Sequence, residues 1–161
     1  MPSLPPAIPE ADVQRLAKAY LQAVYRWRSN GDWQDIHVGM PVPALEFMHP
    51  GVACFGLLSA WNPYSQPRED ARNRIADQAL EAELDARGLV RIPSFSSATN
   101  RSWREPGWVI FDIQAGELDA LARRFGQLGT LWWPRGQPVR LRMQAAKPAR
   151  FRHAAPIDWL E

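Results

Sequence analysis

Apolar residues recur at two different spacings along the chain, and each spacing predicts one kind of element. Between residues 13 and 27, apolar side chains recur at intervals of three and four, which predicts a helix over residues 10–28. The Ser-Asn-Gly sequence at 29–31 is typical of a helix end, because glycine readily adopts the left-handed conformation there. Residues 31–43 contain two glycines and two prolines, which predicts an irregular segment.

Helical and strand patterns alternate from residue 51 onward. The continuous apolar run at 51–60 predicts a buried central strand. Helical spacing predicts a helix over 67–87 closed by Gly88, and another around 118–125 closed by Gly126. Further strands are predicted at 89–95, 108–113, 128–133 and 138–143. Pro93 cannot donate a backbone hydrogen bond, so we expect the strand 89–95 at a sheet edge.

The order of these elements predicts the fold class. Over residues 51–133 it is β-α-β-β-α-β, which is typical of a ferredoxin-like α+β fold, a split βαβ core. The helix at 10–28 and the strand at 138–143 are then an added N-terminal helix and an added C-terminal strand. Residues 1–9 are rich in proline and predict an extended arm, so residues 10–161 form a single domain.

Composition narrows the class of protein further. The chain has 161 residues, 46% hydrophobic and 22% charged, as is usual for a globular protein that does not span a membrane. It has neither a long apolar run nor the pattern of a signal peptide, so we expect a cytoplasmic protein without membrane contact. Cys54 is the single cysteine and the three histidines lie in separate segments, which predicts no metal site. Since no phosphate-binding or dinucleotide-binding glycine motif occurs, we expect no cofactor.

Charge is spread unevenly, although the net charge is only +2. Residues 121–161 hold eight lysines and arginines against two acidic residues. Such a segment is either a solvated surface, which we favour, or a contact region for a polyanion. In the second case a nucleic acid would contact the following arginines: Arg140, Arg142, Arg150 and Arg152. Strand aromatics could stack on RNA bases, but the common RNA-recognition motif is absent.

The stretch SAWNPYSQPREDARNR, residues 59–74, places many hydrogen-bonding groups at one strand-to-helix corner. In a ferredoxin-like topology the loop at 99–106 and the segment 125–127 meet this corner at one sheet edge. We therefore predict a ligand-binding pocket there, formed by Trp61, Asn62, Arg68, Arg72, Asn73 and Gln127. The two arginines lie one helical turn apart and suit an anion, and the amides supply donors and acceptors. Glu105 is the candidate catalytic acid or base.

A purely structural interpretation explains the same residues. Asn62 and Pro63 can form a simple turn, while Asn73 and Gln127 can cap helix ends. Glu105 can form an ion pair with Arg68 or Arg104. On residue types alone this interpretation is the stronger one, because polar residues are common at helix ends.

A family resemblance favours a shared site. SAWNP, an asparagine about a dozen residues later, EP before an apolar strand, and ARRFGQ resemble a family of short bacterial proteins known as domain of unknown function 3293. The resemblance covers roughly residues 53–133, and its motif falls on Trp61, Asn62, Pro63, Asn73, Glu105, Phe125, Gly126 and Gln127. It implies a common site and no particular activity.

Our first functional hypothesis is that the pocket binds a small polar or anionic, nucleotide-like ligand. The sequence does not decide whether the protein is an enzyme, since no nucleophile–base pair is visible. The second hypothesis is a nucleic-acid-binding module that uses the basic C-terminal region. The third is a protein–protein adaptor that uses a strand edge.

Overall fold

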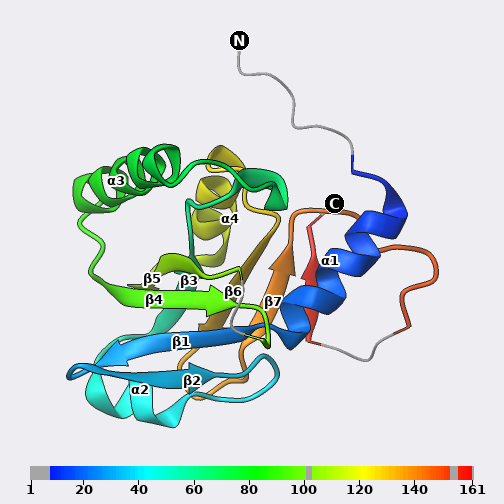
Figure 1. Ribbon diagram of the computed structural model, residues 1–161. Helices are drawn as coiled ribbons and strands as arrows, with labels where there is room; N and C mark the ends of the chain where they lie inside the picture. Colours follow the sequence, from blue (N-terminus) through cyan, green and yellow to red (C-terminus); the bar gives the residue numbers. More distant parts are fainter. Residues whose placement is uncertain (1–7, 101–102, 153–155, 161) are drawn as a thin grey trace.

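A computed structural model describes residues 8–100, 103–152 and 156–160 of the chain (Figure 1). Its helices are α1 (Glu10–Gln22), α2 (Pro43–Met48), α3 (Asp70–Ala86), α4 (Ala115–Arg124) and the short 3-10 helix η1 (Pro63–Ser65). Its strands are β1 (Val24–Ser29), β2 (Asp32–Ile36), β3 (Cys54–Leu58), β4 (Arg91–Ser97), β5 (Glu105–Phe111), β6 (Gly129–Pro134), β7 (Arg140–Met143) and β8 (Ile157–Trp159).

All these strands belong to one eight-stranded sheet in the order β2-β1-β4-β5-β3-β6-β7-β8. Neighbouring strands are antiparallel except β7 and β8, which are parallel. The sheet is strongly curled, so that β1 and β2 lie almost crosswise to β7 (Figure 1). The prediction of a ferredoxin-like fold is therefore wrong. The succession β-α-β-β-α-β does occur from β3 to β6, but these four strands are the middle of a larger mixed sheet and not a sheet of their own.

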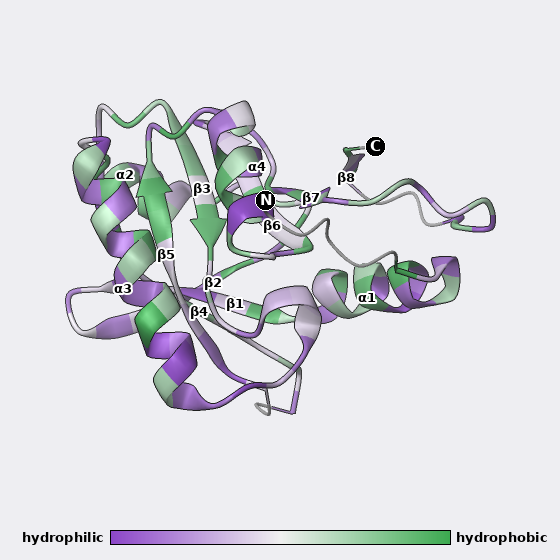
Figure 2. Ribbon diagram, turned by 90° about the horizontal axis from the view of Figure 1, so that it is seen from above, coloured by the Kyte–Doolittle hydropathy of each residue, from purple (hydrophilic) through white to green (hydrophobic). Residues whose placement is uncertain are grey.

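Helices cover both faces of the curled sheet. On one face, α3 and α4 pack on the central strands through buried leucines such as Leu80, Leu84 and Leu118. On the other face, a second core lies inside the curl and is built around Trp27, Phe55 and Trp133. α1 and α2 contribute to this second core through fully buried residues. Figure 2 shows β3 mostly hydrophobic, whereas hydrophilic and hydrophobic residues alternate along α1 and α3.

The N-terminal third differs most from the prediction. The helix expected over 10–28 ends at Gln22, and β1 begins at Val24. Tyr25, Trp27 and Ser29 are the buried residues of β1, which is the period of a strand. Asn30 and Gly31 both have positive φ, 47° and 88°, and form the tight turn of a hairpin with β2 instead of a helix end. The segment 31–43, expected to be irregular, thus contains β2.

The prediction that strand 89–95 lies at a sheet edge is also wrong. β4 lies between β1 and β5, and its pairing with β1 covers only Ser94–Ser97. Pro93 sits just outside that ladder, so its missing N–H interrupts no bond to β1.

The predicted strands and helices from residue 51 to 143 are present, with bounds shifted by a few residues. Gly88 and Gly126, both with positive φ, follow α3 and α4 as predicted. β8 was not predicted. Most of the expected N-terminal arm, residues 1–7, lies outside the described residues. No helix in the described part of the chain has both the length and the apolar character needed to cross a lipid bilayer.

Candidate functional site

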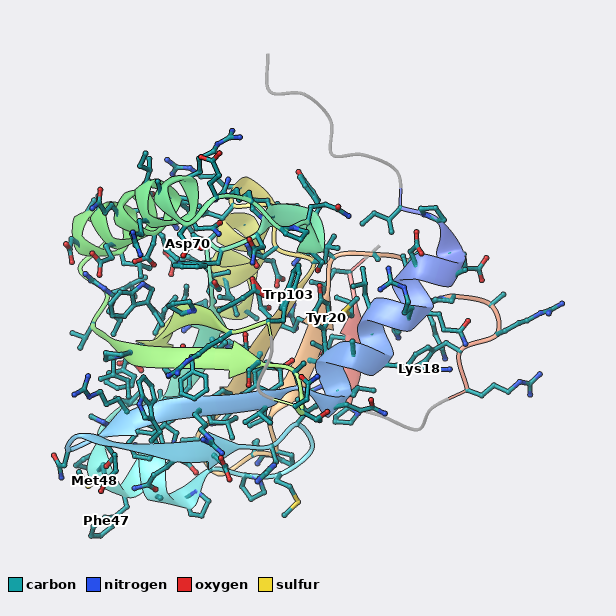
Figure 3. All side chains as sticks on the ribbon, viewed as in Figure 1. Lys18, Tyr20, Phe47, Met48, Asp70 and Trp103 are labelled. Atoms are coloured by element: carbon teal, nitrogen blue, oxygen red, sulfur yellow. The ribbon has the colours of Figure 1, made fainter. Side chains whose placement is uncertain are left out.

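A cavity of about 340 Å³ lies between α1 and the inner face of the curled sheet; we call it the α1 cavity. Its apolar lining comes from the core, where Leu57, Leu131 and Leu141 are almost fully buried. Polar lining residues come from the strand-to-helix corner and from the end of β4. In Figure 3, Tyr20 and Trp103 lie next to each other where α1 faces the strand ends, whereas Lys18 points away from the sheet. The α1 cavity is therefore a pocket with an apolar interior and polar groups from several separate segments.

Asn73 holds the corner together from behind the cavity. Its side chain is only 1% exposed, and its Oδ1 accepts hydrogen bonds from the Asn62 backbone N–H (2.9 Å) and from Arg68 Nε (2.6 Å). Its Nδ2 donates to Asn62 Oδ1 at 2.9 Å. Both sides of the Asn73 amide are thus satisfied by protein groups, as a buried amide requires. Asn73 is consequently a positioning residue for Asn62 and does not line the cavity.

Glu105, the first residue of β5, brings a carboxyl group to the cavity. Its Oε1 accepts a hydrogen bond from Trp103 Nε1 (3.1 Å), and its Oε2 accepts one from Asn62 Nδ2 (3.3 Å). Burial raises the pKa of Glu105 to about 7, although both hydrogen bonds act in the opposite direction. A carboxyl group with a pKa near 7 can gain or lose a proton under physiological conditions.

Gln127 connects the end of α4 to the corner. Its backbone N–H donates to the Ala122 carbonyl and that of Gly126 to the Arg123 carbonyl, which closes α4 in a Schellman motif. The side-chain Nε2 of Gln127 then donates to the Trp61 carbonyl at 2.9 Å. Gly126 has a φ of +67°, and a Cβ at this position would lie 2.7 Å from Pro63 Cβ. Only glycine therefore allows the corner to pack so closely against the helix end.

The corner backbone itself is strained. Asn62, Tyr64 and Ser65 have φ values of 47°, 58° and 56°, in the left-handed region that residues other than Gly and Asn seldom occupy. The Tyr64 N–H donates to the Gly126 carbonyl at 2.7 Å, which helps hold this conformation. Such clusters of strained residues persist only where the surroundings fix them, and they are frequent at functional sites.

Tyr20 is a lining residue that the sequence interpretation missed, because it was assigned to the apolar face of a helix. Its hydroxyl lies 2.5 Å from Ser65 Oγ, which joins α1 to the corner. Burial raises the pKa of Tyr20 to about 12, so its hydroxyl stays protonated at neutral pH. A Cβ on Gly129 would lie 2.8 Å from the ring, so the glycine in β6 permits this close approach. In the sequence, Gly129 at the start of a predicted strand was the one local signal that another side chain approaches the sheet closely there.

Some of the predicted site residues line the α1 cavity and the others do not. Asn62, Glu105 and Gln127 line the α1 cavity. The side chains of Arg68 and Asn73 bond to each other behind it, and Arg68 Nη2 also donates to the Ala60 carbonyl at 3.1 Å. Burial and the nearby charge of Arg72 lower the pKa of Arg68. The backbone carbonyl of Trp61 accepts a hydrogen bond from Gln127, and Arg72 is exposed on α3.

The four arginines assigned to nucleic-acid contact do not form one free patch. Arg142 pairs with Asp119 through two hydrogen bonds of 2.9 and 2.7 Å, and its Nη1 lies 3.2 Å from Asp158. Arg140 also pairs with Asp158. Arg150 and Arg152 are exposed. Two of the four positive charges are thus compensated by aspartates. In the described part of the chain, no three His, Cys, Asp or Glu residues are grouped as metal ligands.

Comparison with known proteins relates one segment of the chain to a family. Residues 58–129 match the sequence model of the family described as "Protein of unknown function (DUF3293)", which confirms the resemblance stated above. This segment runs from the end of β3 to the start of β6 and contains the whole corner with Glu105 and Gln127. Searches among curated proteins and among solved structures gave no match.

Proposed function

We propose that this chain, whose residues 58–129 match the DUF3293 family model, binds a small organic ligand in the α1 cavity. The observation that carries the proposal is the convergence of Asn62, Glu105 and Gln127 on a cavity with an apolar interior. These three residues come from separate segments of the chain, and each is fixed by hydrogen bonds to its neighbours.

The shape and lining of the cavity support binding. Its volume of about 340 Å³ lies at the small end of the range for pockets that enclose small molecules. Such pockets are mainly apolar with a few polar groups that orient the ligand, which describes the α1 cavity. The ligand therefore has an apolar body, and its polar end meets Glu105. This differs from an anionic ligand held by Arg68 and Arg72, because Arg68 bonds inward to Asn73 and the Ala60 carbonyl.

Glu105 is also the residue to which we assign any proton transfer at this site. Its pKa of about 7 lets it act as an acid or a base near neutral pH. No observation favours nucleic-acid binding as a second function, since Arg140 and Arg142 already pair with aspartates.

The test is a screen of small aromatic and aliphatic fragments by saturation-transfer NMR with the full chain. Ala19 lines the mouth of the cavity on α1 and is exposed, so Ala19→Phe fills the mouth without disturbing the core. Lys18→Phe is the matched control, because Lys18 lies on the same helix and points away from the sheet (Figure 3). We expect fragments that bind the wild type and Lys18→Phe but not Ala19→Phe. If every bound fragment also binds Ala19→Phe, the cavity is not the binding site.

A further inference from the structure

We propose that the ligand is an amine that binds in its protonated form, with an aromatic or aliphatic body in the apolar interior of the α1 cavity and its ammonium group against Glu105. This inference rests on the proposed function and adds the chemical class of the ligand. It follows from the balance of charges, donors and acceptors around the cavity.

The charges around the cavity favour a cation. Among the described lining residues, Arg15 and Glu105 are the two with a formal charge. The Arg15 side chain is 68% exposed and lies 3.6 Å from Asp12, so solvent screens its charge. Glu105 is half-buried, and its field inside the cavity is therefore screened less. An anionic ligand would be repelled by the ionised carboxylate, and a cationic one attracted.

The hydrogen-bond groups of the corner also favour a ligand that donates. The Nδ2 of Asn62 already donates to Glu105, and the Nε2 of Gln127 donates to the carbonyls of Trp61 and Phe125. The Ser59 hydroxyl donates to the Pro106 carbonyl. Within the described residues these three donors are engaged, whereas Gln127 Oε1 and the remaining lone pairs of Glu105 are acceptors without a donor. The Thr130 hydroxyl, which also lines the cavity, has no partner among the described residues and can accept as well as donate. An ammonium group offers three donors and no acceptor, which matches this surplus.

Aromatic rings complete the arrangement. The Trp103 indole is fixed against the carboxyl group by its hydrogen bond to Glu105 Oε1 and is 44% exposed, so part of its face is available. Tyr20 and Tyr25 also line the cavity. Aromatic faces attract cations through their quadrupole, and they do so more strongly when water is excluded. A carboxylate among aromatic rings is thus a site suited to an amine.

Three probes with one ring and different head groups test the class of ligand: phenethylamine, 2-phenylethanol and 3-phenylpropionate. Their dissociation constants are measured by NMR titration of the full chain at about pH 8 and low salt. We expect phenethylamine to bind at least about tenfold more tightly than the alcohol, and the carboxylate to bind least. In Glu105→Gln we expect the amine to lose this preference, so that the dissociation constants of the amine and the alcohol become about equal.

Asp12→Asn is the control for a general loss of negative charge. Asp12 lies on α1 outside the cavity lining, so this variant should keep the preference for the amine. If amine and alcohol bind the wild type equally and Ala19→Phe blocks both, the amine inference is wrong while the proposed function stands. If the amine preference survives in Glu105→Gln, Glu105 is not its counter-ion and the inference is overturned. If none of the three probes binds, the amine inference is again overturned, and the fragment screen with Ala19→Phe then decides the proposed function separately.

Discussion

The half-buried carboxyl group of Glu105 should make the stability of the free protein fall as pH rises, and Glu105→Gln should remove this effect. Burial raises the pKa of Glu105 from 4.5 to about 7 in the folded state. Between these values the folded protein keeps a proton that the unfolded chain has released, so folding is favoured at the lower pH. The stabilisation is fully present below pH 4.5 and is lost as pH rises through 7. Above pH 7 the effect levels off, because the carboxyl group is ionised in both states.

The two pKa values set the size of the effect. One pKa unit corresponds to about 1.4 kcal/mol, and integration between pH 5 and pH 8 gives a loss of about 2–3 kcal/mol in the free energy of unfolding. Relative to the wild type, Glu105→Gln should therefore gain about 2–3 kcal/mol in stability over this range. The same change also removes the cost of holding a negative charge in the cavity.

Urea denaturation followed by tryptophan fluorescence at several pH values measures this difference. Asp32→Asn is the control, because it removes an acidic group that is exposed on β2. The difference between control and wild type should change little with pH. A difference between Glu105→Gln and wild type that stays constant from pH 5 to pH 8 would show that the folded protein does not perturb Glu105, and the electrostatic argument for the site would fail.

Three further changes test the structure around the site by urea or thermal denaturation. Asn73→Ala removes the acceptor of Arg68 Nε and two further hydrogen bonds to Asn62, and should lower the free energy of unfolding by about 3 kcal/mol. Gln78→Ala, at an exposed position of α3, should change it by less than about 0.5 kcal/mol, and equal effects of the two variants would contradict the role of Asn73. Gly129→Ala places a methyl group 2.8 Å from the Tyr20 ring and should cost about 1–3 kcal/mol, and unchanged stability would mean that Tyr20 does not pack there. Arg142→Ala leaves Asp119 without its bidentate partner and should cost about 2–3 kcal/mol, while exposed Arg150→Ala should cost less than about 0.5, so similar small losses would contradict a structural role for Arg142.

The central elements could be predicted because their patterns are long and unambiguous. β3 is one continuous apolar run, and α3 and α4 are each followed by a glycine with positive φ. The boundary between α1 and β1 could not be placed in this way. Tyr20, Val24 and Trp27 fit a helical period, yet Tyr25 and Trp27 equally fit a strand. The Asn-Gly turn that decides for a strand was interpreted as a helix end.

The full sheet was beyond the reach of local patterns. β1 pairs with β4 across more than sixty residues of sequence, and β8 adds in parallel to β7. Such pairings depend on contacts between distant segments, which periodicity along one segment does not encode. The ferredoxin-like prediction failed for this reason, even though the succession of its central elements was recognised.

The candidate site, too, could be predicted only in part from the sequence. The strand-to-helix corner, Glu105 and Gln127 were expected at one sheet edge because β3, β5 and α4 place them there. The sequence could not show that Arg68 and Asn73 satisfy each other, since both residue types also suit a ligand. It also could not show that Tyr20 and Ser65 meet, because that contact depends on how α1 crosses the sheet.

The most direct test of the central claim follows the side-chain N–H signal of Trp103 during titration with phenethylamine. This indole N–H donates to Glu105 at the cavity, and the signal is assigned by its loss in Trp103→Phe. A ligand bound in the α1 cavity should shift this signal in a saturable way and leave the signal of Trp33, on the distant strand β2, unchanged. If binding is saturable but the Trp103 signal does not move, the ligand lies elsewhere and the α1 cavity is not the functional site.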